Sequence, residues 1–151
     1  MAENDFQHNE KSVTVDAATT VEIEHVAADG SVASLKGPFP LLAGEVLDAT
    51  FMSESALVDF LREQVRDAKA KDVLFSLHLK ATMMKVSDPI IFGHAVRIFF
   101  GDLFAKHGAT FETLGVDVTN GFGDLLARLA DLSDEERSAI EADIQEVLAR
   151  G

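Results

Sequence analysis

The sequence predicts a mixed α/β (α+β) fold, in which antiparallel N-terminal strands precede a helix, one further strand and several helices around a single sheet. Three observations support this: period-two alternation before residue 52, a hairpin signal at Asp29-Gly30, and helical spacing of apolar residues after Ser53. Strands followed by helices are typical of a layered fold, whereas a doubly wound nucleotide-binding unit alternates strands and helices throughout.

The N-terminal third reads as strands. Residues 1–11 are polar and are expected to be a flexible N-terminus, and residues 12–150 are expected to form a single α/β domain. Apolar and acidic residues alternate from Val21 to His25, which is typical of a half-buried strand. Asp29-Gly30 predicts a turn, after which Val32 to Leu35 returns antiparallel.

Turn residues and apolar spacing define the next elements. Gly37-Pro38 and Pro40 are expected to interrupt the chain before a strand at about 45–51. Ser53 is a suitable N-cap, and apolar residues at helical spacing predict a helix over about 54–69. Its polar face carries Glu63, Arg66 and Asp67.

The second half is predicted to be one strand and three helices. Val73 to Lys80 has the composition of a buried strand, and a helix apolar on nearly all sides is expected from Pro89 to about Lys106. His107-Gly108 is expected to end that helix. A shorter helix around Leu125 precedes a last one, whose N-terminus is predicted by the capping-box pair Ser133 and Glu136.

Composition narrows the class of function. A formal net charge of −13 repels phosphate groups, so neither nucleic acid nor an anionic membrane surface is an expected partner. There are no cysteines, which excludes disulfides and thiolate metal sites and fits a cytoplasmic protein. No apolar run reaches the roughly 18 residues that a membrane helix needs, and the acidic N-terminus does not resemble a targeting peptide.

The candidate chemistry lies where the strand over 73–80 ends. Lys80 occupies the carboxyl end of this strand, at the edge where open α/β sheets bind ligands. Lys85 follows in a loop that leads to a helix N-terminus, so two cations would attract a carboxylate or phosphate. A second cation would also lower the pKa of Lys80, as acid–base catalysis requires. The alternative is that Lys80 is a solvated residue that ends a strand.

The other polar residues carry weaker signals. His78 is expected to be a hydrogen-bonding residue and His94 a structural one, because no paired His or His/carboxylate motif accompanies them. Gly121-Phe122-Gly123 lacks the preceding strand and third glycine of a dinucleotide fingerprint. The sequence therefore predicts no metal-binding and no cofactor-binding residue in this chain.

The stretch from His78 to His94, His-Leu-Lys-Ala-Thr-Met-Met-Lys-Val-Ser-Asp-Pro-Ile-Ile-Phe-Gly-His, resembles a signature of the monomeric-type NADP-dependent isocitrate dehydrogenases. The resemblance covers roughly residues 8–149 and includes Glu10-Lys11-Ser12, Leu41 to Val46, Asn120-Gly121 and Glu141 to Gln145. Because members of that family are several times longer, the resemblance implies an internal segment with an isopropylmalate/isocitrate dehydrogenase-like fold.

The resemblance also implies a function. The family oxidises and decarboxylates isocitrate to 2-oxoglutarate with NADP and a Mg or Mn ion, and its catalytic lysine corresponds to Lys80. Thr82 and Lys85, in the same loop, are candidates for substrate binding. The family's substrate clamp, metal-binding aspartates, partner tyrosine and NADP contacts lie outside this stretch, so the isolated chain is expected to bind no cofactor and to be inactive.

Two other functions remain open from the sequence. The apolar helix over 89–106 also fits a non-enzymatic module derived from that enzyme, which forms a homodimer or binds the remainder of the enzyme. A free-standing module that binds small acids through Lys80 and Lys85 is the third possibility.

Overall fold

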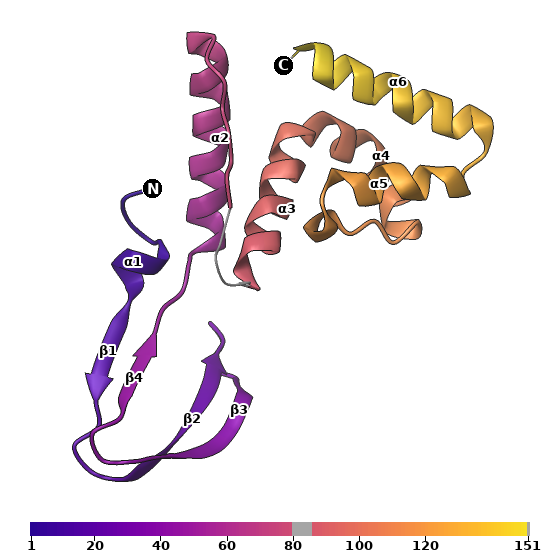
Figure 1. Ribbon diagram of the computed structural model, residues 1–151. Coiled ribbons are helices and arrows are strands. Elements are labelled where there is room, and N and C mark those ends of the chain that lie inside the picture. The colour runs from indigo at the N-terminus through magenta and orange to yellow at the C-terminus, as the bar shows by residue number, and fades with distance from the viewer. Residues whose placement is uncertain (80–85, 151) are drawn as a thin grey trace. The chain divides into compact units, whose positions relative to one another are not determined.

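The computed structural model describes residues 1–79 and 86–150. The chain is divided into two compact units, Met1–Ser53 and Glu54–Gly151, where the sequence predicts a single domain over residues 12–150. No residue of the first unit is buried, whereas the second has an apolar core. The mixed α/β class with antiparallel N-terminal strands is confirmed (Figure 1).

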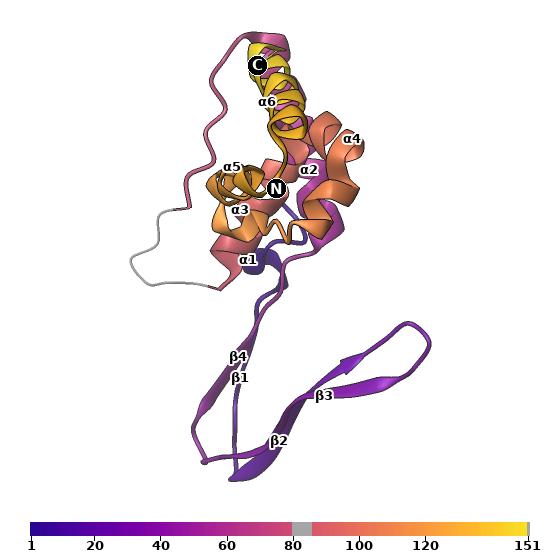
Figure 2. The ribbon, with the colours of Figure 1, turned by 90° about the vertical axis from the view of Figure 1, so that its right-hand side faces the viewer.

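The first unit contains two two-stranded antiparallel sheets rather than part of a single sheet (Figure 2). Strand β1 (Lys11–Thr14) pairs with β4 (Val46–Ala49), and β2 (Thr19–Val26) pairs with β3 (Val32–Leu41). A single helical turn, α1 (Phe6–Asn9), lies within the segment expected to be flexible. Its N-terminus forms because the Asp5 side chain accepts a hydrogen bond from the His8 amide at 2.8 Å.

The predicted hairpin between β2 and β3 is confirmed. Asp29 accepts hydrogen bonds from the amide and hydroxyl of Ser31, and Gly30 has a φ of 85°, which favours glycine. The expected interruption at Gly37-Pro38 and Pro40 is wrong, because β3 continues to Leu41. Each strand of a two-stranded ribbon has one unpaired edge, and edge strands tolerate proline.

The second unit begins with α2 (Glu54–Lys71), which confirms the predicted helix. Leu57, Leu61 and Ala68 are its buried residues. Beyond it, the predicted strand over Val73–Lys80 is wrong for its described part, since residues 73–79 form neither strand nor helix. A strand requires a hydrogen-bonded neighbour, and within residues 54–79 and 86–150 there is no strand to provide one.

The apolar helix predicted over 89–106 is two helices, α3 (Ser87–Phe99) and α4 (Gly101–Thr113). The break lies at Phe100, which has φ −95° and ψ 29° and is followed by Gly101, a weak helix former. A straight helix that is apolar all round needs cover on every side. The bend instead allows Val96 from α3 and Leu103 from α4 to reach the same core.

The predicted end of the helix at His107-Gly108 is also wrong, because α4 continues to Thr113. Its end is instead a Schellman motif at Gly115, which has a φ of 66°. In this motif the Gly115 amide donates to the Glu112 carbonyl and the Val116 amide donates to the Phe111 carbonyl. Of the two glycines in this region, Gly108 and Gly115, only Gly115 has the left-handed conformation.

Two 3₁₀ helices and two α-helices complete the unit: η1 (Val118–Asn120), α5 (Phe122–Arg128), η2 (Leu129–Asp131) and α6 (Asp134–Arg150). The predicted capping box is confirmed, since the Glu136 amide donates to Ser133 Oγ and the Ser133 amide to Glu136 Oε2, both at 3.3 Å. Among the described residues, no helix has both the length and the apolar character needed to cross a membrane.

A single apolar cluster holds the helices together from α3 to α6. The rings of Phe100 and Phe122 are stacked with their centroids 4.0 Å apart, and Leu125 is completely buried. Gly93 lets α3 approach η1, because a Cβ atom there would lie 3.3 Å from Val118 Cγ2. The cluster consists of Val96, Phe100, Leu103, Phe111, Val118, Leu125, Leu129, Ile140 and Ile144.

Leu125→Ala is expected to lower the free energy of unfolding of the helical unit by about 2–5 kcal/mol, because it opens a cavity at a fully buried site. Leu126→Ala, at the adjacent position with 48% of its side chain exposed, is the matched control and is expected to cost less than about 1 kcal/mol. Urea unfolding followed by circular dichroism measures both. Equal losses for the two variants would contradict the position of the core.

Candidate functional site

The predicted site residues Lys80, Thr82 and Lys85 lie outside the described residues. The chain is described up to Leu79 on one side, where His78 is exposed, and again from Val86 on the other. Helix α3 then begins at Ser87, with no side chain capping its first turn. The helix start expected near Pro89 thus lies two residues earlier.

His94 has a structural environment. Its side chain is 21% exposed, and its Nε2 atom lies 3.9 Å from Glu54 Oε1. The pair joins the first turn of α2 to the middle of α3. This agrees with the interpretation of His94 as a structural residue.

The described residues do not form a metal site. Across residues 1–79 and 86–150, no three His, Asp or Glu side chains are grouped in a way that could hold an ion. A divalent cation usually takes several oxygen or nitrogen ligands. The described part of the chain therefore does not by itself fit the Mg or Mn ion that the family resemblance implies.

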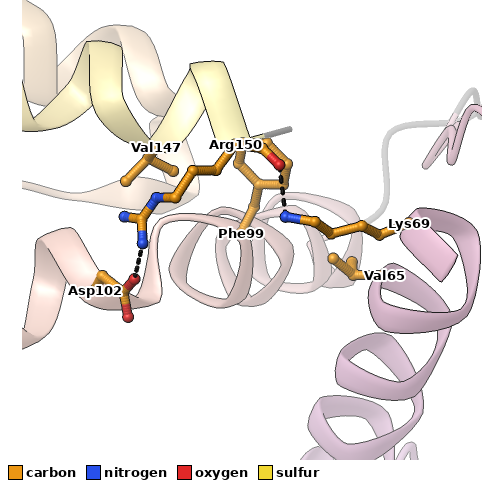
Figure 3. Close-up of a pocket in the computed structure, with 6 residues that line it drawn as sticks. All are labelled: Val65, Lys69, Phe99, Asp102, Val147 and Arg150. Atoms are coloured by element: carbon orange, nitrogen blue, oxygen red, sulfur yellow. Dashed lines mark hydrogen bonds and ion pairs between the residues drawn. The ribbon is translucent and has the colours of Figure 1, made fainter. Parts of the chain in front are cut away.

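A small hollow of about 160 Å³ lies among α2, α3, α4 and α6 (Figure 3). Lys69 Nζ donates to the Arg150 carbonyl oxygen at 2.5 Å, and Arg150 forms an ion pair with Asp102 at 3.1 Å. Both cations of the hollow therefore have partners within the protein. The bond from Lys69 joins the end of α2 to the end of α6, because a lysine interacts favourably with the last carbonyl groups of a helix.

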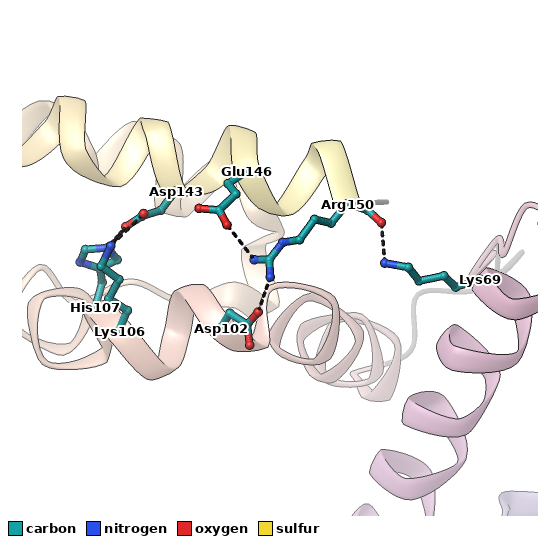
Figure 4. Close-up of polar contacts among 7 residues, drawn as sticks. All are labelled: Lys69, Asp102, Lys106, His107, Asp143, Glu146 and Arg150. Carbon is teal, nitrogen blue, oxygen red and sulfur yellow. Dashed lines mark hydrogen bonds and ion pairs between the residues drawn. The ribbon is translucent and has the colours of Figure 1, made fainter.

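A second polar group joins α4 to α6 (Figure 4). Asp143 accepts from Lys106 Nζ at 2.8 Å, and His107 Nε2 lies 2.6 Å from its other oxygen. The hydrogen bond from Lys106, and then that from His107, lowers the pKa of Asp143 below its ordinary value. The side chains of His107 and Asp143 are only 16% and 21% exposed, so this pair is partly shielded from water.

A third polar group was not anticipated from the sequence. Asp124 accepts from the Asp117 amide at 2.8 Å and from Arg128 Nε at 2.9 Å, and Arg128 donates to the Leu114 carbonyl. The bond from the Asp117 amide, and then that from Arg128, lowers the pKa of Asp124. The spacing of Asp124 and Arg128 by four residues was the available signal. The group stabilises the connection between α4 and α5.

A larger hollow of about 240 Å³ is lined almost entirely by apolar side chains. It lies among α2, α3, the start of α5 and residues 75–77, with Phe92, Phe99 and Phe122 among its walls. Among the described residues, the side chains that line it are all apolar, so this part of its wall can accept apolar groups.

The comparison with protein families decides the relationship. The family model described as "Monomeric isocitrate dehydrogenase" matches residues 1–151, the whole of the chain. The chain belongs to the monomeric isocitrate dehydrogenase family.

Curated members of the family agree with this. The chain is 58% identical over 149 residues to "Isocitrate dehydrogenase [NADP] 2" of Colwellia maris. It is 51% identical over 148 residues to "Isocitrate dehydrogenase [NADP]" of Corynebacterium glutamicum, and 50% identical over 144 residues to "Isocitrate dehydrogenase [NADP] 2" of Mycobacterium tuberculosis. These matches cover 95–99% of this chain but only 19–20% of each relative.

Membership in the monomeric isocitrate dehydrogenase family gives the described polar groups a context. The groups around Asp143, Asp124 and Arg150 contact other elements of the same helical unit. Each carboxylate is held by a cation or an amide, and none faces the large hollow. In this segment of the isocitrate dehydrogenase fold, they therefore connect elements of the helical unit to one another.

Asp143→Asn is expected to weaken the pH dependence of the stability of this segment. A lowered pKa in the folded state means that the Asp143 carboxylate stabilises the fold above the unfolded value of about 3.9. That contribution is lost as the pH falls through the lowered folded-state pKa. The wild type should therefore be more stable than the variant near neutral pH, with the difference disappearing in acid. Urea unfolding at a series of pH values measures this.

Glu112→Gln is the matched control for that experiment. Glu112 lies on α4, like Lys106 and His107, and its side chain is exposed. The control should follow the wild type over the whole pH range. A difference between Asp143→Asn and wild type that is independent of pH would contradict the role of the carboxylate charge.

Proposed function

We propose that this chain is the lysine-bearing part of an NADP-dependent isocitrate dehydrogenase, which converts isocitrate to 2-oxoglutarate by oxidative decarboxylation. The observation that carries the proposal is the 58% identity over 149 residues to an NADP isocitrate dehydrogenase, a match that includes position 80. The same proposal assigns the enzyme to the cytoplasm and to the tricarboxylic acid cycle.

Lys80 is proposed to transfer a proton to and from the substrate. After carbon dioxide leaves, the product is an enolate whose carbon must gain a proton, and a lysine ammonium is a suitable donor. Before that proton is transferred, its positive charge stabilises the enolate oxygen. The chain contains no tyrosine, so the tyrosine that partners this lysine in the family must come from elsewhere in the enzyme.

Thr82 and Lys85 are proposed to support substrate binding. Isocitrate carries three carboxylates, and a cation with a neighbouring hydroxyl supplies hydrogen bonds that such groups accept. In the complete enzyme NADP accepts the hydride, and a Mg or Mn ion polarises the substrate. The family resemblance assigns the residues that would hold both groups to other parts of the enzyme.

Lys80→Met in a full-length enzyme that carries this segment is expected to lower kcat by about 10²–10⁴-fold with little change in KM. The methionine has a similar length but cannot carry a proton. Lys71→Met is the matched control, since the Lys71 side chain is 64% exposed and its partner among the described residues is Asp67, four residues away. It should leave kcat unchanged. A Lys80→Met enzyme with normal turnover would overturn the assignment.

The isolated 151-residue chain is expected to form no NADPH from isocitrate, because orientation and metal electrostatics supply most of the rate in such reactions. Absorbance of NADPH in the presence of isocitrate, NADP and Mg or Mn measures this. Turnover by this chain alone would show that the other parts of the enzyme are dispensable.

A second candidate function is a non-enzymatic module that self-associates. The observation that favours it is the apolar exposure of α3, where Ile90 is 48%, Phe92 39% and Phe99 39% exposed. Large apolar side chains that remain exposed favour association. The isolated chain would then be a homodimer.

Light scattering of the isolated chain tests this second function. Under it, Ile90→Glu restores a monomer, because a carboxylate buried in an apolar interface is costly. Leu126→Glu is the control, since Leu126 is an equally exposed leucine on α5, at 48%. A wild-type chain that is monomeric at all accessible concentrations excludes the self-associating module.

A further inference from the structure

Helix α3 makes a close contact with η1 at Gly93. A Cβ atom at this position would lie 3.3 Å from Val118 Cγ2, 3.4 Å from the Thr119 amide nitrogen and 3.4 Å from the Val118 carbonyl carbon. Two of these three atoms belong to the backbone of η1, which cannot rotate away as a side chain can. A side chain at position 93 therefore forces α3 and η1 apart by a few tenths of an ångström.

The η1 side of this contact is firmly held. The Asp117 carboxylate accepts from the Thr119 amide at 2.9 Å and from the Thr119 hydroxyl at 2.7 Å. The Gly121 amide donates to the Val118 carbonyl at 2.9 Å, and the Val118 side chain is buried in the apolar cluster. A close-packed core resists displacement of such a side chain. When a side chain is added at position 93, it is therefore α3 that moves.

The first turn of α3 is held more weakly. No side chain caps it, and Val86, which precedes its first residue, is 85% exposed. Pro89 and Ile90 are exposed as well. The first amides of a helix have no partner within it, and helix ends are among the least stable parts of a fold. A shift of α3 at Gly93 is therefore carried to its N-terminus, which lies about 9 Å away along the helix axis.

A second contact of α3 lies beside Gly93 but constrains the helix less. His94 Nε2 lies 3.9 Å from Glu54 Oε1 in the first turn of α2. The Glu54 side chain is 76% exposed, and exposed ion pairs are weak because water screens them. Gly93 is buried, so its contact with η1 is the stronger constraint on where α3 lies.

The start of α3 adjoins a proposed substrate-binding residue. Lys85, which lies outside the described residues, directly precedes Val86 in the sequence. Its proposed role is to bind a carboxylate of isocitrate. Such a cation must lie within hydrogen-bond distance of the carboxylate, and a small displacement weakens the bond. The position of α3 therefore sets the point from which the backbone of Lys85 continues.

We propose that Gly93 is a positioning residue for isocitrate binding, because its lack of a side chain lets α3 pack against η1 and α3 in turn fixes the backbone next to Lys85. Gly93 acts through α3 and does not itself touch the substrate. The inference rests on the proposed function, since it takes Lys85 as a substrate-binding residue. Glycine within a helix is less favourable than alanine, and the close approach to η1 is the reason for it here.

Gly93→Ala in a full-length enzyme that carries this segment tests the inference. The KM for isocitrate is expected to rise about 10-fold, because a displacement of a few tenths of an ångström weakens the bond to the substrate carboxylate. Binding energy lost equally from the ground state and the transition state raises KM alone, so kcat is expected to stay unchanged. Initial rates of NADPH formation over a range of isocitrate concentrations measure both.

Gly108→Ala is the matched control. It makes the same exchange within α4, where an added Cβ atom would meet nothing within 4 Å. This variant should keep the KM of the wild type. An unchanged KM for isocitrate in Gly93→Ala overturns the proposal. A lower kcat with an unchanged KM also overturns it, since a loss of folded enzyme has that effect.

Val118→Ala combined with Gly93→Ala is a rescue experiment. It removes Cγ2, the atom nearest to the new Cβ, and is expected to bring the KM for isocitrate back to within about 3-fold of the wild type. The same change opens a cavity at a buried site, so it lowers stability. KM and stability should thus move in opposite directions. A double variant with a higher KM than Gly93→Ala would show a purely structural role and overturn the proposal.

Lys85→Met separates this inference from the proposed function. If Lys85 binds isocitrate, this variant has a raised KM, and adding Gly93→Ala raises it no further, because both changes act on the same cation. A normal KM in Lys85→Met overturns the proposed role of Lys85. A raised KM there, together with a normal KM in Gly93→Ala, keeps that role and overturns the positioning role. A further increase in the combined variant overturns the action of Gly93 through Lys85.

Discussion

The helical unit depends on its buried apolar cluster, in which the ring of Phe100 also stacks on the partly buried ring of Phe122. The two rings are nearly parallel, at 7°, and they join the break between α3 and α4 to the start of α5. Leu103, Leu125 and Leu129 are almost fully buried around them. Because burial of large apolar side chains is the main favourable term in folding, the positions of the surrounding helices follow from this cluster. The bend at Phe100 is what brings both α3 and α4 to it.

Polar groups connect the helices at the edge of this core. In a chain with a formal net charge of −13, carboxylates repel one another unless cations or amides hold them. Lys106 and His107 hold Asp143 between α4 and α6, and Arg128 holds Asp124 beside α5. These contacts lower the pKa values of both aspartates, so the fold is best stabilised when the carboxylates are ionised.

The two units differ in whether they have a buried apolar core. The helical unit has a core of its own, whereas no residue of Met1–Ser53 is buried and its strands form two separate pairs. Isolated two-stranded ribbons are only marginally stable in water. A unit without a buried core of its own is the pattern expected of a segment that is stabilised by further polypeptide. It agrees with a chain that matches 20% of the length of its relatives.

Local patterns in the sequence determined the β2–β3 hairpin, helix α2, the capping box of α6, and the membership of the family. A turn dipeptide, a cap and an apolar period act within a few residues, and so they can be recognised without the rest of the fold. They also led to Lys80, Thr82 and Lys85 as site residues, which lie outside the described part of the structure. Only the tertiary structure decided that the long apolar helix bends at Phe100, that α4 ends at Gly115, and that residues 73–79 are not a strand. The reason is physical: a helix bends or continues according to what covers its faces, and a strand exists only where a second backbone accepts and donates its hydrogen bonds.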